Sequence, residues 1–194
     1  MNKSNAFRVD FGGMYSSRAI NTGYLSLAYR RLGRVGQTFS ANSYFGKFYG
    51  SGKVTWVSAD QIEANQSWVK KWKVLIPRAS DGNENYPLPI WDQAGPFVSG
   101  PDEACSETYI VASLAKTKSE AEHIATYLRT KFCRFLISIR KGTQDNKSAL
   151  FEFVPDVPFD RAWTDAELYK RYSLSKVDIA FIDSMIREMK FTNE

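Results

Sequence analysis

Apolar and polar residues follow two different periods in the part of the chain after residue 53. The segment 54–57 (VTWV) alternates with the two-residue period of a strand, and short apolar runs at 73–77, 96–99 and 107–113 predict three further strands. Pro77 ends the first of these runs, as expected where a strand loses a backbone donor. The sequence GPDEAC between the last two runs is typical of a turn. We therefore expect a small sheet here.

Between residues 117 and 141 the apolar residues repeat with a period of 3.6, which predicts one long helix that anchors the core. Thr117 and Glu120 form a capping box at its start, and Gly142 follows two basic residues at its end. The predicted apolar face consists of Ala121, Ile124, Ala125, Leu128, Phe132, Phe135, Leu136 and Ile139.

Three more helices and one more strand are predicted around this central element. The helices begin at Ser58 (with Gln61 three residues later, continuing to about Trp72), at Thr164 (with Glu167) and at Ser175 (continuing to about Met189). The sequence FEFVPDV at 151–157 predicts a strand that Pro155 interrupts. The order of these elements predicts a mixed α/β (α+β) fold.

The first 53 residues have a different composition, because they hold most of the glycines and many tyrosines and phenylalanines. This mixture is typical of hairpins or of a partly mobile segment, with a short helix at 24–32 (YLSLAYRRL) as the exception. We therefore predict two parts: a basic N-terminal segment, 1–53, and an α/β domain, 54–194, that ends in two helices at about 160–190.

Charge is distributed unevenly between these two parts. Residues 1–53 contain eight basic residues and one acidic residue, a net charge of +7, whereas the remainder has 18 basic and 20 acidic residues. A basic segment of this kind favours a polyanionic partner, because lysine and arginine release counterions when they neutralise phosphates. A solvated basic face is the alternative explanation. A membrane surface is a weaker one, since the segment shows no amphipathic basic helix.

The overall composition is that of a folded globular chain of one domain, or of one domain with a small appendage. No apolar run approaches the ~18 residues that cross a bilayer, and the first residues lack the apolar core of a secretory signal. We therefore expect a cytoplasmic protein without a membrane partner.

Metal-dependent or nucleophilic catalysis finds little support in the sequence. Cys105 and Cys133 lack metal-ligand spacing, and His123 is the only histidine. A nuclease would use Pro-Asp followed by Asp/Glu-x-Lys, and the letters fit Asp102 with 145–147 and Asp156 with 188–190. These acids are predicted in turns, loops and a helix end instead of on adjacent strands. We therefore predict no catalytic residue and no metal site.

Four sequences between residues 73 and 169 follow one another in order: KVLIPRASDG, PFVSGPDEACSETYIVASL, SEAEHIATYLRTKFCRFLISIRK and FVPDVPFDRAWTDAELY. They resemble the C-terminal target-recognition (specificity) region of adenine-N6 DNA methyltransferases, particularly the bifunctional type II restriction-modification enzymes that join nuclease, methyltransferase and specificity parts. The resemblance covers residues 40–189. Such methyltransferases need an Asn/Asp-Pro-Pro-Tyr/Phe motif and a Gly-rich loop for S-adenosylmethionine, whereas this chain has no Pro-Pro pair.

The resemblance implies a DNA-binding specificity domain: a small mixed sheet with packed helices and a C-terminal helical pair. Its implied partners are double-stranded DNA and a methyltransferase/endonuclease catalytic domain or subunit. S-adenosylmethionine would belong to that catalytic partner, so no cofactor is expected in this chain. The sequences KVLIPRA, GPDEACSETY and TKSEAEHIATYL are expected to form the scaffold.

DNA contacts are predicted where basic and aromatic residues mix on the glycine-rich stretch 29–53, because arginine reads guanine or binds phosphate. An edge hairpin with solvated charges is the alternative for this stretch. Two later basic residues are added as phosphate contacts. The predicted DNA-binding residues are Arg30, Arg31, Arg34, Tyr44, Lys47, Tyr49, Lys53, Arg78 and Lys141.

Two other functions stay open. The chain could be an interaction module that docks the catalytic part of such a complex through its C-terminal helices, and exposure of Phe181, Met185 and Met189 would favour that function. A stand-alone nuclease would instead require Asp102, Asp145 and Lys147 to cluster around one metal ion.

Overall fold

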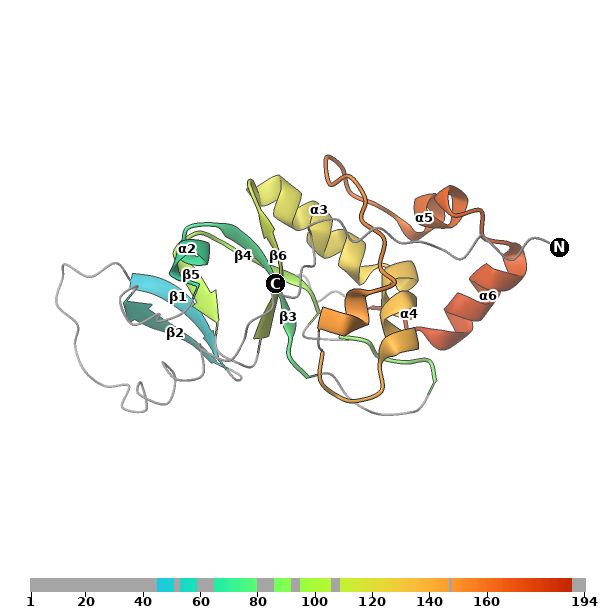
Figure 1. The fold of residues 1–194 in the computed structure, drawn as a ribbon, viewed down its shortest axis with the longest axis horizontal. Coiled ribbons are helices and arrows are strands. Elements are labelled where there is room, and N and C mark those ends of the chain that lie inside the picture. The colour runs from blue at the N-terminus through green and yellow to red at the C-terminus, as the bar shows by residue number, and fades with distance from the viewer. Residues whose placement is uncertain are drawn as a thin grey trace.

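Two three-stranded sheets and a group of helices make up the computed structural model, which describes residues 45–50, 53–58, 65–79, 86–91, 95–105, 109–146 and 148–189 (Figure 1). The predicted mixed α/β fold class is confirmed. The elements are β1 (Phe45–Gly50), β2 (Lys53–Ser58), α2 (Gln66–Val69), β3 (Trp72–Pro77), β4 (Phe97–Ser99), β5 (Glu103–Cys105), β6 (Tyr109–Ala115), α3 (Lys118–Arg129), α4 (Lys131–Arg140), the 3₁₀ helix η2 (Ser148–Phe151), α5 (Asp165–Arg171) and α6 (Lys176–Met185).

The first sheet has the strand order β2-β1-β5. β1 and β2 form an antiparallel hairpin that closes at the pair Gly50 and Lys53. β1 also pairs in parallel with β5, which lies in the sequence predicted as a turn. The predicted boundary at residue 53 therefore falls within one hairpin.

The second sheet has the strand order β4-β3-β6 and is antiparallel throughout. Its three strands confirm the apolar runs that the sequence showed. The residues of β3 alternate between two faces: Val74 and Ile76 belong to the large core with α3, whereas Leu75 belongs to a smaller core with Cys105 and Val111. Figure 1 shows the first sheet on one side of β3 and β6, and helices α3 to α6 on the other.

The predicted long helix at 117–141 is wrong in one respect, because it is two helices. Thr130 interrupts it with an extended ψ of 148°, and its hydroxyl accepts a hydrogen bond from the N–H of Cys133 at 3.2 Å. Asp165 adds a second cap, since its carboxylate accepts hydrogen bonds from the N–H groups of Lys131 and Phe132. α4 thus begins with its own N-cap and an acid from α5.

The predicted strand at 151–157 is absent from the described residues, where 148–151 form η2, turns follow at 152–154, and 155–157 have no regular secondary structure. Side chains hold this backbone in place of a neighbouring strand. The hydroxyl of Tyr127 donates to the carbonyl of Pro155 at 2.7 Å, and the indole N–H of Trp163 donates to Pro158 at 2.8 Å.

The helix predicted from Thr164 is confirmed, with both halves of its capping box formed. The last helix begins after Ser175, also with a complete box, but ends at Met185 because the chain then pairs with Leu88. The N–H of Leu88 donates to Met185 at 2.7 Å, and the N–H of Arg187 donates to Leu88 at 3.1 Å. The helix predicted at 58–72 is wrong at both ends, because Ser58 lies in β2 and Trp72 in β3; the described helix within this range is α2, Gln66–Val69. No described helix has the length and apolarity that crossing a membrane requires.

Candidate functional site

The predicted DNA-binding residues fall into three groups in the structure. Arg30, Arg31, Arg34 and Tyr44 lie outside the described residues. Lys47 and Lys53 lie on the two strands of the β1–β2 hairpin, and Tyr49 shares β1 with Lys47. Arg78 and Lys141 lie elsewhere in the scaffold, after β3 and after α4.

Tyr49 packs into the smaller core between the two sheets. Its ring lies 5.1 Å from the ring of Phe97, which in turn contacts Tyr109 edge-on at 5.3 Å. Its hydroxyl donates a hydrogen bond of 3.1 Å to the Oε2 atom of Glu103 on β5. The half-buried side chain of Tyr49 therefore ties the hairpin to the rest of the fold.

Lys73 lies on β3 and is only 3% exposed. Its ammonium group is surrounded by four backbone carbonyls, those of Trp68, Val69, Lys71 and Gly100, at 3.2, 3.2, 2.7 and 2.9 Å. Burial lowers the pKa of Lys73 to about 8, although the nearby negative charge of Glu103 opposes this shift. The hydrogen bonds of the Lys73 ammonium therefore hold the residues around α2 and the turn after β4 together.

The turn between β4 and β5 is held from both sides. The N–H of Gly100 donates to Oε2 of Glu103 at 2.7 Å, and the N–H of Asp102 donates to the carbonyl of Val69 at 2.8 Å. Asp102 has a positive φ of 64° and forms an ion pair with Lys70. These bonds fix the turn from which β5 starts.

Arg78 and Lys141, far apart in sequence, are brought together by Asn146. The N–H of Asn146 donates to the carbonyl of Arg78 at 2.6 Å, and its side-chain amide donates to Pro77 at 2.8 Å. Its Oδ1 accepts from the ammonium of Lys141 at 3.1 Å. Burial lowers the pKa of Lys141, although the negative charge of neighbouring Asp145 opposes this shift. Two predicted phosphate contacts therefore share one edge of the fold, and Arg78 is exposed.

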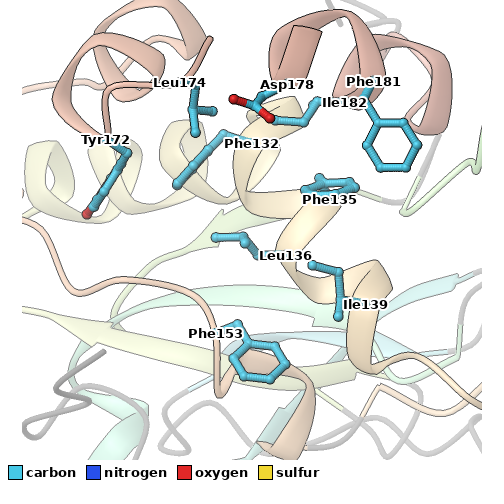
Figure 2. Close-up of a pocket in the computed structure, with 10 residues that line it drawn as sticks. All are labelled: Phe132, Phe135, Leu136, Ile139, Phe153, Tyr172, Leu174, Asp178, Phe181 and Ile182. Atoms are coloured by element: carbon cyan, nitrogen blue, oxygen red, sulfur yellow. The ribbon is translucent and has the colours of Figure 1, made fainter. Parts of the chain in front are cut away.

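An apolar groove of about 430 Å³ opens between α4 and α6 (Figure 2). Phe181 and Ile139 are each 55% exposed there, whereas Met185 is half-buried and Met189 is buried. The rings of Phe135 and Phe181 meet edge-on at 5.9 Å. The groove is lined by Phe132, Phe135, Leu136, Ile139, Phe153, Tyr172, Leu174, Asp178, Phe181 and Ile182.

The acids considered for a nuclease do not converge. Asp102 bonds to Val69 before β3 begins, whereas Asp145 pairs with Ala79 after β3 has ended. The six residues of β3 separate them by about 20 Å, so they do not share one metal ion. Lys147 lies outside the described residues. Within the described ranges, no three His, Cys, Asp or Glu residues are grouped to hold a metal ion.

The cysteines and the histidine are engaged in packing and hydrogen bonding. Cys105 and Cys133 are buried free thiols, and burial raises the pKa of Cys105 to about 12 and also raises that of Cys133. Both thiols therefore stay protonated at neutral pH. Nδ1 of His123 lies 2.9 Å from the carbonyl of Phe159, so this ring links α3 to the loop before α5.

Sequence reasoning missed Lys73 and Glu103, which organise the hairpin's attachment. The sequence did contain one indication of this role. Lys73 is the first residue of an otherwise apolar run, and a charged residue in a buried strand needs hydrogen-bonding partners. Comparisons of the chain with protein-family models, with curated proteins and with solved structures found no match.

Proposed function

We propose that the chain is the DNA-recognition part of a restriction-modification adenine-N6 methyltransferase, and that a separate domain or subunit supplies catalysis and S-adenosylmethionine. The observation that carries the proposal is that Asn146 bonds both the backbone carbonyl of Arg78 and the ammonium group of Lys141, so that two basic residues lie at one edge of the fold. The basic N-terminal segment and the resemblance of residues 40–189 to target-recognition regions support it. In this proposal the scaffold orients DNA through phosphate contacts, and residues of the basic segment read bases.

The Asn146 edge supplies the test of this proposal. Replacing Arg78 and Lys141 together by alanine is expected to weaken binding to all duplexes alike, because phosphate contacts carry no sequence information. The slope of log affinity against log salt concentration should fall by about two, since each neutralised phosphate contributes about 0.9 to it. Fluorescence anisotropy with a labelled duplex at several salt concentrations measures this slope.

The matched control is the double variant Lys170→Ala and Lys176→Ala, which removes the same charge from two exposed positions of α5 and α6. Its slope should stay close to that of the unaltered chain. The single variant Arg78→Ala avoids any effect of losing the Lys141–Asn146 bond and should lower the slope by about one. Equal slopes in the edge and control variants would remove this edge from the DNA-binding surface.

The groove favours a second candidate function, docking of the catalytic part. Its α4 wall places Phe132, Phe135, Leu136 and Ile139 at the i, i+3, i+4 and i+7 spacing of one helix face. Such a wall beside α6 suits an amphipathic helix that inserts a few large apolar side chains. We propose that a helix of the methyltransferase catalytic part binds in this groove.

A photo-crosslinking amino acid at Val177 would test docking, because this residue is 77% exposed and lies one turn from Phe181. In the cells from which the gene comes, the expected product joins this chain to a protein with an Asn/Asp-Pro-Pro-Tyr/Phe motif. Adding Phe181→Ser should abolish that product. Crosslinks only to proteins without the motif, or crosslinks that survive Phe181→Ser, would refute docking through the groove.

A further inference from the structure

We propose that Tyr49, Glu103 and Lys73 form a positioning network that sets the β1–β2 hairpin on the second sheet, and that Tyr49 thereby supports DNA binding without touching DNA. The part that concerns DNA rests on the proposed function. Tyr49 is a positioning residue in this scheme, and the hairpin that it anchors carries Lys47 and Lys53, two of the residues predicted to bind DNA.

The network starts from a rigid point in the second sheet. Lys73 is buried, and its ammonium donates to the carbonyl of Gly100 at 2.9 Å as well as to three carbonyls around α2. A buried charge with several acceptors is costly to displace, because any acceptor left behind would lose its partner. The position of Gly100 is therefore set by the core of the sheet.

Gly100 is in turn linked to the hairpin through the side chain of Glu103. The N–H of Gly100 donates to Oε2 of Glu103 at 2.7 Å, and that oxygen also accepts from the hydroxyl of Tyr49 at 3.1 Å. Both bonds are made to a carboxylate, so they are stronger than bonds between neutral groups. A continuous path of hydrogen bonds thus runs from β3 through β5 to β1.

The hairpin depends on this path because its backbone pairing with β5 is short. Among the described residues, three register pairs join the two strands: Lys47 with Glu103, Phe48 with Ala104 and Tyr49 with Cys105. Parallel pairing is also slightly less stable per residue than antiparallel pairing. The Tyr49 side chain, with its ring on Phe97 and its hydroxyl on Glu103, supplies the side-chain anchor seen among the described residues.

Hydrogen exchange without DNA tests the network itself. Tyr49→Phe keeps the ring and removes the hydroxyl, and it should speed amide exchange in residues 45–50 and 103–105 about fivefold, the effect of one missing hydrogen bond. Glu103→Ala removes the acceptor of both Tyr49 and Gly100, so it should speed exchange more than Tyr49→Phe does, whereas Glu103→Gln should keep protection because its amide oxygen still accepts. The matched control is Tyr127→Phe, which removes a bond to Pro155 in the helical part and should leave the hairpin's exchange unchanged.

A double-mutant cycle then separates positioning from general stability. Tyr49→Phe should weaken DNA binding about fivefold in the unaltered chain and have little effect once Lys47 and Lys53 are both alanine. Additive effects, or unchanged exchange at 45–50 in Tyr49→Phe, would overturn the proposal. If exchange responds as expected but the unaltered chain binds no DNA, the network stands and the proposed function fails.

Discussion

Asp165→Ala is expected to lower the free energy of unfolding by about 3 kcal/mol, because it removes two charge-assisted hydrogen bonds that are each worth about 1.5 kcal/mol or more. The carboxylate accepts from the N–H of Lys131 at 3.0 Å and from that of Phe132 at 2.8 Å. These amides belong to the first turn of α4 and have no partner within their own helix. The negative charge also lies at the positive end of the helix dipole.

Urea denaturation followed by tryptophan fluorescence measures this change. Asp160→Ala is the matched control, since Asp160 is an exposed carboxylate in the loop before α5. The control should stay within about 0.5 kcal/mol of the unaltered chain. A destabilisation below about 1 kcal/mol for Asp165→Ala would show that Asp165 contributes no more than an ordinary neutral hydrogen bond.

Arg134→Met is expected to cost about 3 kcal/mol, because it leaves two carbonyls without their charged donor. Arg134 is 2% exposed, and its Nε donates to the carbonyl of Arg129 at 2.9 Å. Its Nη1 donates to the carbonyl of Arg187 at 2.8 Å. Methionine retains much of the apolar stem, so the loss of stability measures the missing guanidinium hydrogen bonds and not the creation of a large cavity. Because Arg187 also bonds Leu88, release of the segment after α6 should accompany destabilisation.

Limited proteolysis between residues 186 and 189, together with thermal unfolding, checks both effects. Lys170→Met serves as the control, since it removes one positive charge from an exposed helix position. Faster cleavage and a lower Tm are expected for Arg134→Met alone. Cleavage and melting equal to the control would mean that the guanidinium does not anchor the C-terminal segment.

The sequence predicted elements well wherever one local pattern dominated. The apolar run that became β3 ends at Pro77, and the Thr164–Glu167 box opens α5 as predicted. Thr130 shows the limit of periodicity. The apolar positions of α3 and α4 continue with one period across it, although the hydroxyl of Thr130 caps α4 by accepting from the N–H of Cys133. Asp165 of α5 adds a second cap at this break, and no local pattern around residue 130 predicts that contact.

Contacts between distant segments account for the other differences. The run at 151–157 has strand-like residues, yet no strand lies beside it among the described residues. The hydroxyl of Tyr127 bonds the carbonyl of Pro155, and the indole of Trp163 bonds that of Pro158 just after the run. β5 has three residues and forms because β1 lies beside it, so the local sequence GPDEAC shows only a turn. Pairing partners of this kind are set by tertiary structure, and no local pattern encodes them.

The candidate site was predicted in part. Arg78 and Lys141 were chosen separately as basic residues, and their shared edge depends on Asn146, which no charge or spacing rule singles out. Tyr49 was chosen as a DNA-facing aromatic residue, and its hydroxyl bonds Glu103 on a strand that the sequence did not predict. Its assignment as a positioning residue follows from that bond.

Binding of the whole chain to a labelled pool of random-sequence duplexes tests whether this protein recognises DNA. Anisotropy is measured at low and at raised salt, and the bound fraction is then selected and sequenced. We predict that binding weakens steeply with salt and that one sequence motif is enriched in the bound fraction. Absence of binding at low salt, or binding without any enriched sequence, would contradict the proposal that this chain recognises DNA.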